Sequence, residues 1–227
     1  MKSNFFKYVF VIFVIGIMIF AIYKIKTEEE KTEQEQMHVS TEEEKITEIK
    51  LGVASFDSTN PILSQNKNVQ DISKLIYEPL LNLTQDYKLE PCLAKEWAKQ
   101  NATTYIIKLK ENVRWSDGEK FTADDVKFTI EKLKSVNSIY SSNVQNIVNL
   151  EIIDDYTLNI ILDKEIPFFE YNLIFPIMSS QFYLDKDFNS DIVPVGTGMY
   201  KYTDVQSTHL VLSKNNNWWN TQTNLTL

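Results

Sequence analysis

Two adjacent aspartates, Asp124 and Asp125, are residues whose type could do chemistry, because paired carboxylates can act as general acid and base. Consecutive residues of a helix point in different directions around its axis, so this pair is poorly placed for joint catalysis. Thr122 stands three positions before Asp125, which is the spacing of a capping box. The pattern therefore predicts a helix that begins at Thr122 and favours a structural role for both aspartates.

The other reactive residue types are isolated. Cys92 is the only cysteine, so its simplest interpretation is a small buried apolar residue. His38 and His209 have no second histidine or cysteine at metal-ligand spacing. Gly196-Thr197-Gly198 is too short for a phosphate-binding loop and indicates a turn. The sequence also lacks G-x-S-x-G and H-E-x-x-H, so we predict no catalytic residue, no metal site, no cofactor and no enzyme.

Alternating and helical apolar patterns predict the elements that position these residues. Ser116 to Gly118 has turn chemistry, and an apolar helical face follows at Val126, Ile130 and Leu133. Phe121 can pack on Val126 as a hydrophobic staple. Further strands are predicted at residues 46–55, 103–110, 149–153, 157–162 and 209–213, and further helices at 69–77 and 167–174.

Composition divides the chain into three parts. Residues 1–26 contain an uncharged apolar run between lysines, which predicts a signal-anchor or transmembrane helix; a cleaved signal peptide is the alternative, although small residues suited to cleavage are scarce there. Residues 27–45 are rich in glutamate and predict an acidic, solvated spacer. Residues 46–227 have the composition of a folded domain. The formal net charge of −8 argues against nucleic acid as a partner.

Five motifs resemble one known family. RWSDGEKFTADDVKFTI at 114–130 is similar to the most recognisable segment of the extracellular solute-binding proteins of the peptide/nickel type, which deliver ligands to ABC importers. YEPLLNLTQDYKLEPCLAKEW at 77–97 precedes this segment, and PVGTGMY at 194–200 and NNNWW at 215–219 come after it, in the family's order. Asn60-Pro61 stands where the family has Asp-Pro. The resemblance covers about residues 46–220.

The resemblance implies an α/β fold, a periplasmic-binding-protein-like lobe with mixed sheets flanked by helices. Residues 46–227 would form the N-terminal lobe, with a smaller companion domain at about 80–165. Family members run well past twice this length, so we expect the second lobe to be missing here and this polypeptide alone to bind peptides weakly. A truncated product, or one half completed by a partner, is an open alternative.

The implied function is a membrane-tethered extracellular solute-binding component of an ABC importer, with a peptide or other small solute and the permease subunits as partners. Whether the ligand is a dipeptide, an oligopeptide, a nickel chelate or a sugar stays open. A cell-surface sensor or interaction protein without transport is the alternative. The residues that we expect at the ligand cleft are Phe56, Asp57, Ser58, Asn60, Tyr77 and Trp115. Core packing of Trp115 and loop capping by Asp57 are competing interpretations.

Overall fold

The computed structural model describes residues 18, 20–28, 48–52, 56–190, 192–206 and 209–220. The chain divides into two compact units, Met1–Ile46 and Thr47–Leu227. In the first unit residues 20–28 are helical. Within the described residues, no helix is long and apolar enough to cross a membrane. Most of the expected membrane segment and of the acidic spacer lies outside the described residues.

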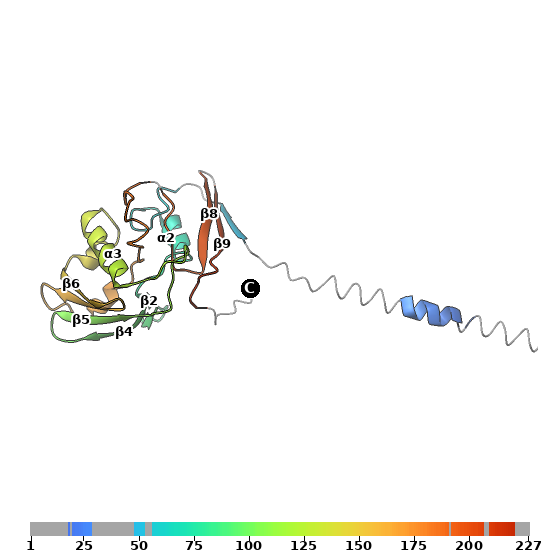
Figure 1. The fold of residues 1–227 in the computed structure, drawn as a ribbon, viewed down its shortest axis with the longest axis horizontal. Coiled ribbons are helices and arrows are strands. Elements are labelled where there is room, and N and C mark those ends of the chain that lie inside the picture. The colour runs from blue at the N-terminus through green and yellow to red at the C-terminus, as the bar shows by residue number, and fades with distance from the viewer. Residues whose placement is uncertain are drawn as a thin grey trace, which may run out of the picture. The chain divides into compact units, whose positions relative to one another are not determined.

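The described part of the second unit contains three sheets and a few helices, most of them short (Figure 1). Its described elements are, in chain order, β1 (Glu48–Gly52), α2 (Lys67–Ser73), β2 (Leu81–Leu83), β3 (Leu89–Pro91), β4 (Ala94–Lys99), β5 (Thr104–Leu109), α3 (Ala123–Ser135), α4 (Ser141–Val144), β6 (Ile147–Asp154), β7 (Thr157–Leu162), the 3-10 helix η1 (Phe169–Asn172), β8 (Tyr200–Gln206) and β9 (His209–Lys214).

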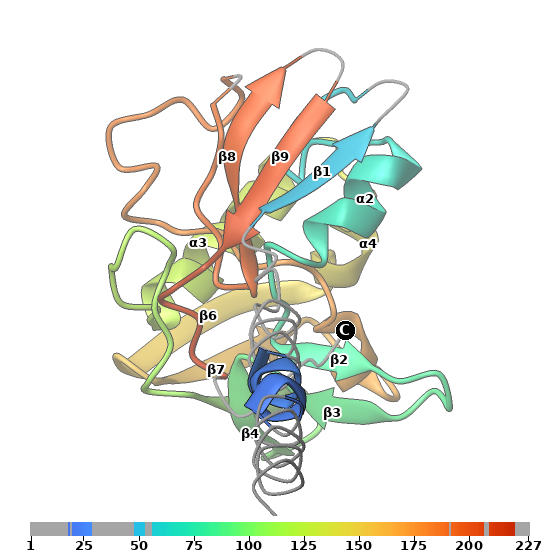
Figure 2. The ribbon, with the colours of Figure 1, turned by 90° about the vertical axis from the view of Figure 1, so that its right-hand side faces the viewer.

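All described strand pairs are antiparallel. A four-stranded sheet has the order β4-β5-β7-β6, a three-stranded sheet the order β1-β9-β8, and β2 pairs with β3. In the three-stranded sheet the beginning of the unit pairs with its end, since Glu48 lies opposite Ser213. Figure 2 shows β1, β9 and β8 side by side, with β2 and β3 apart from them.

The main core lies between α3 and the four-stranded sheet. Alternate residues of β5 and β7 are buried, among them Ile107 and Ile160. The apolar face of α3, including Ile130, is also fully buried, and the helix lies over this sheet in Figure 1. The segment after η1 joins this core to the rest of the unit, because the Met178 backbone N–H donates to the Thr129 hydroxyl of α3 at 2.9 Å.

The predicted α/β class is confirmed, as is the capping box of α3 between Thr122 and Asp125. The strand prediction at 149–153 and 157–162 is confirmed as the β6–β7 hairpin. The helix predicted at 167–174 is wrong: only η1 forms, because Phe168 takes a left-handed backbone with φ 56° that an α-helix cannot contain. The helix predicted at 69–77 begins earlier, since the Asn66 side chain caps it, and it ends at Ser73.

Candidate functional site

The loop that follows β1 carries four of the six expected cleft residues, and hydrogen bonds within the loop fix its shape. One oxygen of Asp57 accepts from the Ser64 hydroxyl at 2.5 Å and the other from the Gln65 backbone at 2.7 Å. Burial alone would raise the pKa of Asp57, but these hydrogen bonds outweigh it and lower the pKa from its ordinary value. The exposed Asp57 carboxylate therefore stays ionised at neutral pH.

Asn60 anchors the loop from the inside. It is 1% exposed, and its side-chain oxygen accepts from the Ile62 backbone at 3.0 Å, which forms the turn at Pro61. Its amide nitrogen donates to the Tyr183 hydroxyl at 3.1 Å. Burial raises the pKa of Tyr183, partly offset by this bond, so the hydroxyl is neutral at physiological pH. Asn60 thus supports the loop and is not itself accessible to a ligand in this conformation.

Tyr77 ties the loop to the segment before β8. Its buried hydroxyl lies 3.3 Å from the Thr59 and Pro194 carbonyl oxygens, and its single proton can be donated to either. The Thr59 hydroxyl also donates to the Ile192 carbonyl at 3.2 Å. The loop after β1 and residues 192–195 therefore lie side by side, although they are more than a hundred residues apart.

These contacts leave one side of the loop accessible. Asp57 is exposed, and Phe56 and Ser58 are partly exposed. Ser58 orients the loop, since its hydroxyl accepts from the Asn60 backbone at 3.0 Å. An ionised carboxylate, a hydroxyl and an aromatic ring on a fixed loop can together accept hydrogen bonds from a polar ligand and pack against its apolar part.

Trp115 lies elsewhere, in a buried polar cluster. It is fully buried, and its indole nitrogen donates to an Asp125 carboxylate oxygen at 3.2 Å. The same oxygen accepts from the Thr122 backbone, and the other accepts from the Ser180 backbone and hydroxyl at 2.7 and 2.8 Å. Burial raises the pKa of Asp125, and these four hydrogen bonds oppose that shift. The arrangement favours the core-packing interpretation of Trp115.

Cys92 and His209, two of the isolated reactive residues of the sequence, lie where packing and strand pairing place them. Cys92 is 4% exposed, and burial together with the nearby Glu78 raises the pKa of its thiol to about 12. A thiol of that pKa is protonated and unreactive at neutral pH. His209 lies 3.5 Å from the Asp204 carboxylate across the β8–β9 pair. Across the ranges that the structure covers, no three acidic, histidine or cysteine side chains gather as a metal site would require.

The sequence pattern of the bacterial extracellular solute-binding proteins, family 5 (middle part), matches residues 88–226, more than half of the chain. The chain belongs to this family. The glutathione-binding protein GsiB of Escherichia coli K12 is 29% identical over 168 residues, which are 71% of this chain and 33% of GsiB. The chain thus spans about a third of the length of the curated relatives that it matches.

Solved structures of family 5 proteins agree with this assignment. NikZ of Campylobacter jejuni, in complex with Ni(L-His), is 28% identical with a TM-score of 0.64, covering 74% of this chain and 35% of NikZ. AppA of Clostridium difficile, a putative peptide-binding protein by its own description, is 26% identical with a TM-score of 0.58, covering 66% of this chain and 33% of AppA.

Family 5 motifs in this chain have identifiable packing roles. A Cβ added to Gly196 would lie 2.0 Å from the Ile76 carbonyl oxygen, and the Gly198 backbone donates to that same oxygen at 2.8 Å. The Asn215 side chain donates to the Gly198 carbonyl at 2.8 Å.

Two residues of the site were not predicted from the sequence. Tyr183 bonds Asn60 and Ser180 bonds Asp125, but these partners lie 123 and 55 positions away and no local pattern marks either residue.

Proposed function

We propose that this chain forms part of the solute-binding component of an ABC importer, that its solute is a short peptide, and that the loop at 56–58 contributes one wall of the ligand site. Family membership supports a binding role. The observation that carries the site is the fixed loop, held by Tyr77 and Asn60 while Asp57 stays exposed and Ser58 partly exposed. A loop ordered before binding loses less entropy when the ligand arrives.

A peptide suits these groups. Its ammonium terminus and backbone N–H groups are donors, and the Asp57 carboxylate and Ser58 hydroxyl are acceptors. The partly exposed Phe56 ring offers an apolar surface to a side chain. GsiB is named for glutathione, itself a short peptide, which is the reason to test that ligand first. A metal chelate is the second candidate, because NikZ was solved with Ni(L-His).

The ligand test is a titration of the 227-residue chain followed by ¹H–¹⁵N NMR, with glutathione, trialanine and Ni(L-His) as separate probes. We expect the two peptides to shift the resonances of Phe56, Asp57 and Ser58. Asp57→Asn should weaken this response severalfold, while Asp117→Asn, which also alters an exposed turn aspartate, should not. Shifts confined to other regions, or a response to the chelate alone, would contradict a peptide site at this loop.

We also propose that residues 1–26 tether the protein to the cell membrane, with the folded unit on its extracellular side. The support is the apolar run between lysines in the sequence. Protease added to intact cells should cut the acidic spacer and release the folded unit, while the uncut chain should sediment with membranes. A mature protein that begins near Thr27 in the medium would show a cleaved signal instead.

Crosslinking in intact cells separates a transporter component from a surface sensor. If the crosslinked protein is recovered without any permease subunit, a surface sensor is favoured over a transporter component.

A further inference from the structure

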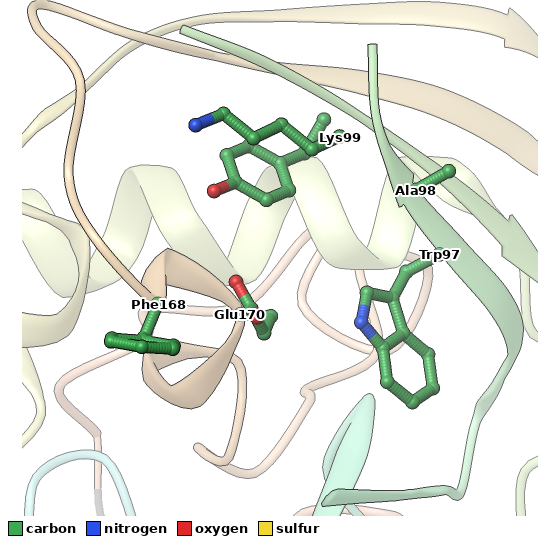
Figure 3. Close-up of a pocket in the computed structure, with 6 residues that line it drawn as sticks. Trp97, Ala98, Lys99, Phe168 and Glu170 are labelled. Atoms are coloured by element: carbon green, nitrogen blue, oxygen red, sulfur yellow. The ribbon is translucent and has the colours of Figure 1, made fainter. Parts of the chain in front are cut away.

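A pocket of about 220 Å³ opens beside the edge strand β4. It is lined by Trp97, Ala98, Lys99, Tyr105, Phe168 and Glu170. Figure 3 shows Glu170 between Phe168 on one side and Trp97 on the other. The pocket is smaller than the ~300–1,000 Å³ that hold drug-sized ligands, so it suits a small group or the end of a longer side chain. It uses none of the residues of the loop at 56–58.

Glu170 brings to this pocket a negative charge that interacts electrostatically with Lys99 but forms no ion pair with it. It is partly buried, and within the described part of the chain its carboxylate has no hydrogen bond or ion pair. Lys99 lines the same pocket, but its ammonium group pairs with Glu165 at 2.6 Å instead. Since Lys99 is neutralised by Glu165, the Glu170 carboxylate sets the sign of the charge that the pocket attracts.

The side of the pocket opposite Trp97 is formed by the ring of Phe168, which is exposed to solvent. Phe168 is 74% exposed, and its left-handed backbone, φ 56° and ψ 36°, is rare for a bulky residue. The ring lies edge-on to Tyr171, with centroids 6.3 Å apart, and the Tyr171 hydroxyl donates to the Tyr87 carbonyl at 3.1 Å. Tyr87 also has a positive φ, 58°. Strained backbone around an exposed ring is typical of a binding site.

We propose that this pocket binds an organic ammonium group, held by the Glu170 carboxylate and by the aromatic faces of Trp97 and Phe168. Aromatic faces attract such cations through the negative charge above the ring, and a carboxylate adds direct ionic attraction. An anion is disfavoured because Glu170 repels it and Glu165 already occupies Lys99. A bare metal ion is disfavoured because one carboxylate among aromatic rings supplies too few oxygen ligands. The cation has two possible sources, a free amine or the lysine side chain of a peptide.

The test compares charged probes with uncharged probes of the same shape, by NMR titration of the 227-residue chain. Choline is matched by 3,3-dimethylbutan-1-ol, and N-acetyl-lysine methylamide by N-acetyl-norleucine methylamide. We expect at least one charged probe to bind about fivefold or more tightly than its neutral counterpart, with shifts at the Trp97 indole. Preference for choline identifies a free amine as the source, and preference for the lysine probe identifies a side chain. Equal binding of charged and neutral probes overturns the proposal.

Single substitutions distinguish a pocket that binds cations from one that binds apolar groups in general. Glu170→Gln should weaken binding of the charged probe about tenfold and leave the neutral probe unchanged. The matched control is Glu131→Gln, an exposed carboxylate of α3 that does not line the pocket. Phe168→Leu should weaken only the charged probe, because it keeps an apolar wall without a ring. Lys99→Met should preserve or strengthen binding of the charged probe; if it abolished that binding, the negative charge of the pocket would not be what holds the probe, and the proposal would be wrong.

Discussion

Trp219 donates a hydrogen bond of 2.7 Å from its indole nitrogen to the carboxylate of Glu78, 141 positions earlier in the chain. Trp218 donates to the other oxygen of the same carboxylate at 3.3 Å. The Lys110 ammonium lies 3.8 Å from the centroid of the Trp219 ring, a cation–π distance. One partly buried carboxylate therefore fastens the end of the described chain to the segment that precedes β2.

Replacing Trp219 with phenylalanine should lower the free energy of unfolding by about 1–3 kcal/mol. The substitution keeps a ring beneath Lys110 but removes the indole N–H from the Glu78 carboxylate, which is left short of a donor. Urea denaturation measures the loss. Trp97→Phe is the matched control, because the Trp97 indole nitrogen has no hydrogen bond within the described residues, and it should change stability by less than about 0.5 kcal/mol. Equal losses in the two variants would mean that the Glu78 contact is not what matters.

Glu78 should also make stability depend on pH. Burial raises its pKa above the ordinary value of 4.5, and the tryptophan N–H groups only partly offset that effect. The folded state therefore holds the proton more tightly than the unfolded state, so this group's contribution to stability is greatest below pH 4.5 and is lost as the pH rises through the folded pKa.

The measurement is the slope of the unfolding free energy against pH from about 4 to 7, compared between the wild type and Glu78→Gln. The unfolding free energy of the variant should fall less steeply with rising pH than that of the wild type, whatever the absolute stability of the variant. Asp57, whose pKa is lowered, contributes in the opposite direction, stabilising above its unfolded pKa, and it contributes equally to both proteins. Parallel slopes in the two proteins would show that Glu78 does not titrate in this range.

Asp125→Ala should cost more than the loss of a helix cap. A capping box alone is worth about 0.5–2 kcal/mol. Asp125 is 2% exposed and also accepts bonds from Trp115 and from Ser180, so its removal leaves further buried donors unpaired. We expect a loss of about 2–4 kcal/mol in thermal or urea unfolding. Asp124→Ala, at the exposed neighbouring position, is the control and should change stability by less than about 0.5 kcal/mol.

Sequence reasoning succeeded where the determinants are local. The capping box of α3 is encoded within four residues, and the β6–β7 hairpin follows from two alternating runs around a turn. It failed where the alternation is interrupted. β8 was not predicted, because the register shift between Tyr202 and Asp204 breaks the period-two pattern on which strand prediction depends. The left-handed Phe168, which stops a helix predicted at 167–174, has no sequence signature either.

The candidate site likewise has some features that the local sequence predicts and others that it does not. The turn at Asn60-Pro61 was expected from its residue types, and a turn is found at these positions in the chain. The contacts that fix the loop are tertiary: Asn60 meets Tyr183, and Tyr77 meets Pro194, each pair more than a hundred positions apart. A single sequence holds no signal for such pairs, because neither partner alters the local pattern of the other.

Gly196→Ala should be as damaging as Asp125→Ala, but for a steric reason. The new methyl group would lie 2.0 Å from the Ile76 carbonyl oxygen, a backbone atom that cannot rotate away. The turn would have to move, which strains the bond from the Gly198 backbone to the same oxygen. We expect a loss of about 2–4 kcal/mol. Gly118→Ala is the informative comparison: its φ is 99°, but the added methyl would lie 3.9 Å from the Asn217 side-chain nitrogen, an ordinary contact, so it should cost only about 1–2 kcal/mol of backbone strain.

The effect of Gly196→Ala should reach the candidate ligand loop. Pro194 lies two residues before Gly196, and the Tyr77 hydroxyl lies 3.3 Å from both the Pro194 and the Thr59 carbonyl oxygens, either of which can accept its proton. Displacement of Pro194 therefore frees one of the two contacts that hold the loop after β1. In NMR spectra of the folded variant, the resonances of residues 56–60 should shift or broaden, whereas Gly118→Ala should leave them unchanged. A destabilised Gly196→Ala protein with an unaltered loop would show that Tyr77 holds the loop through Thr59 alone.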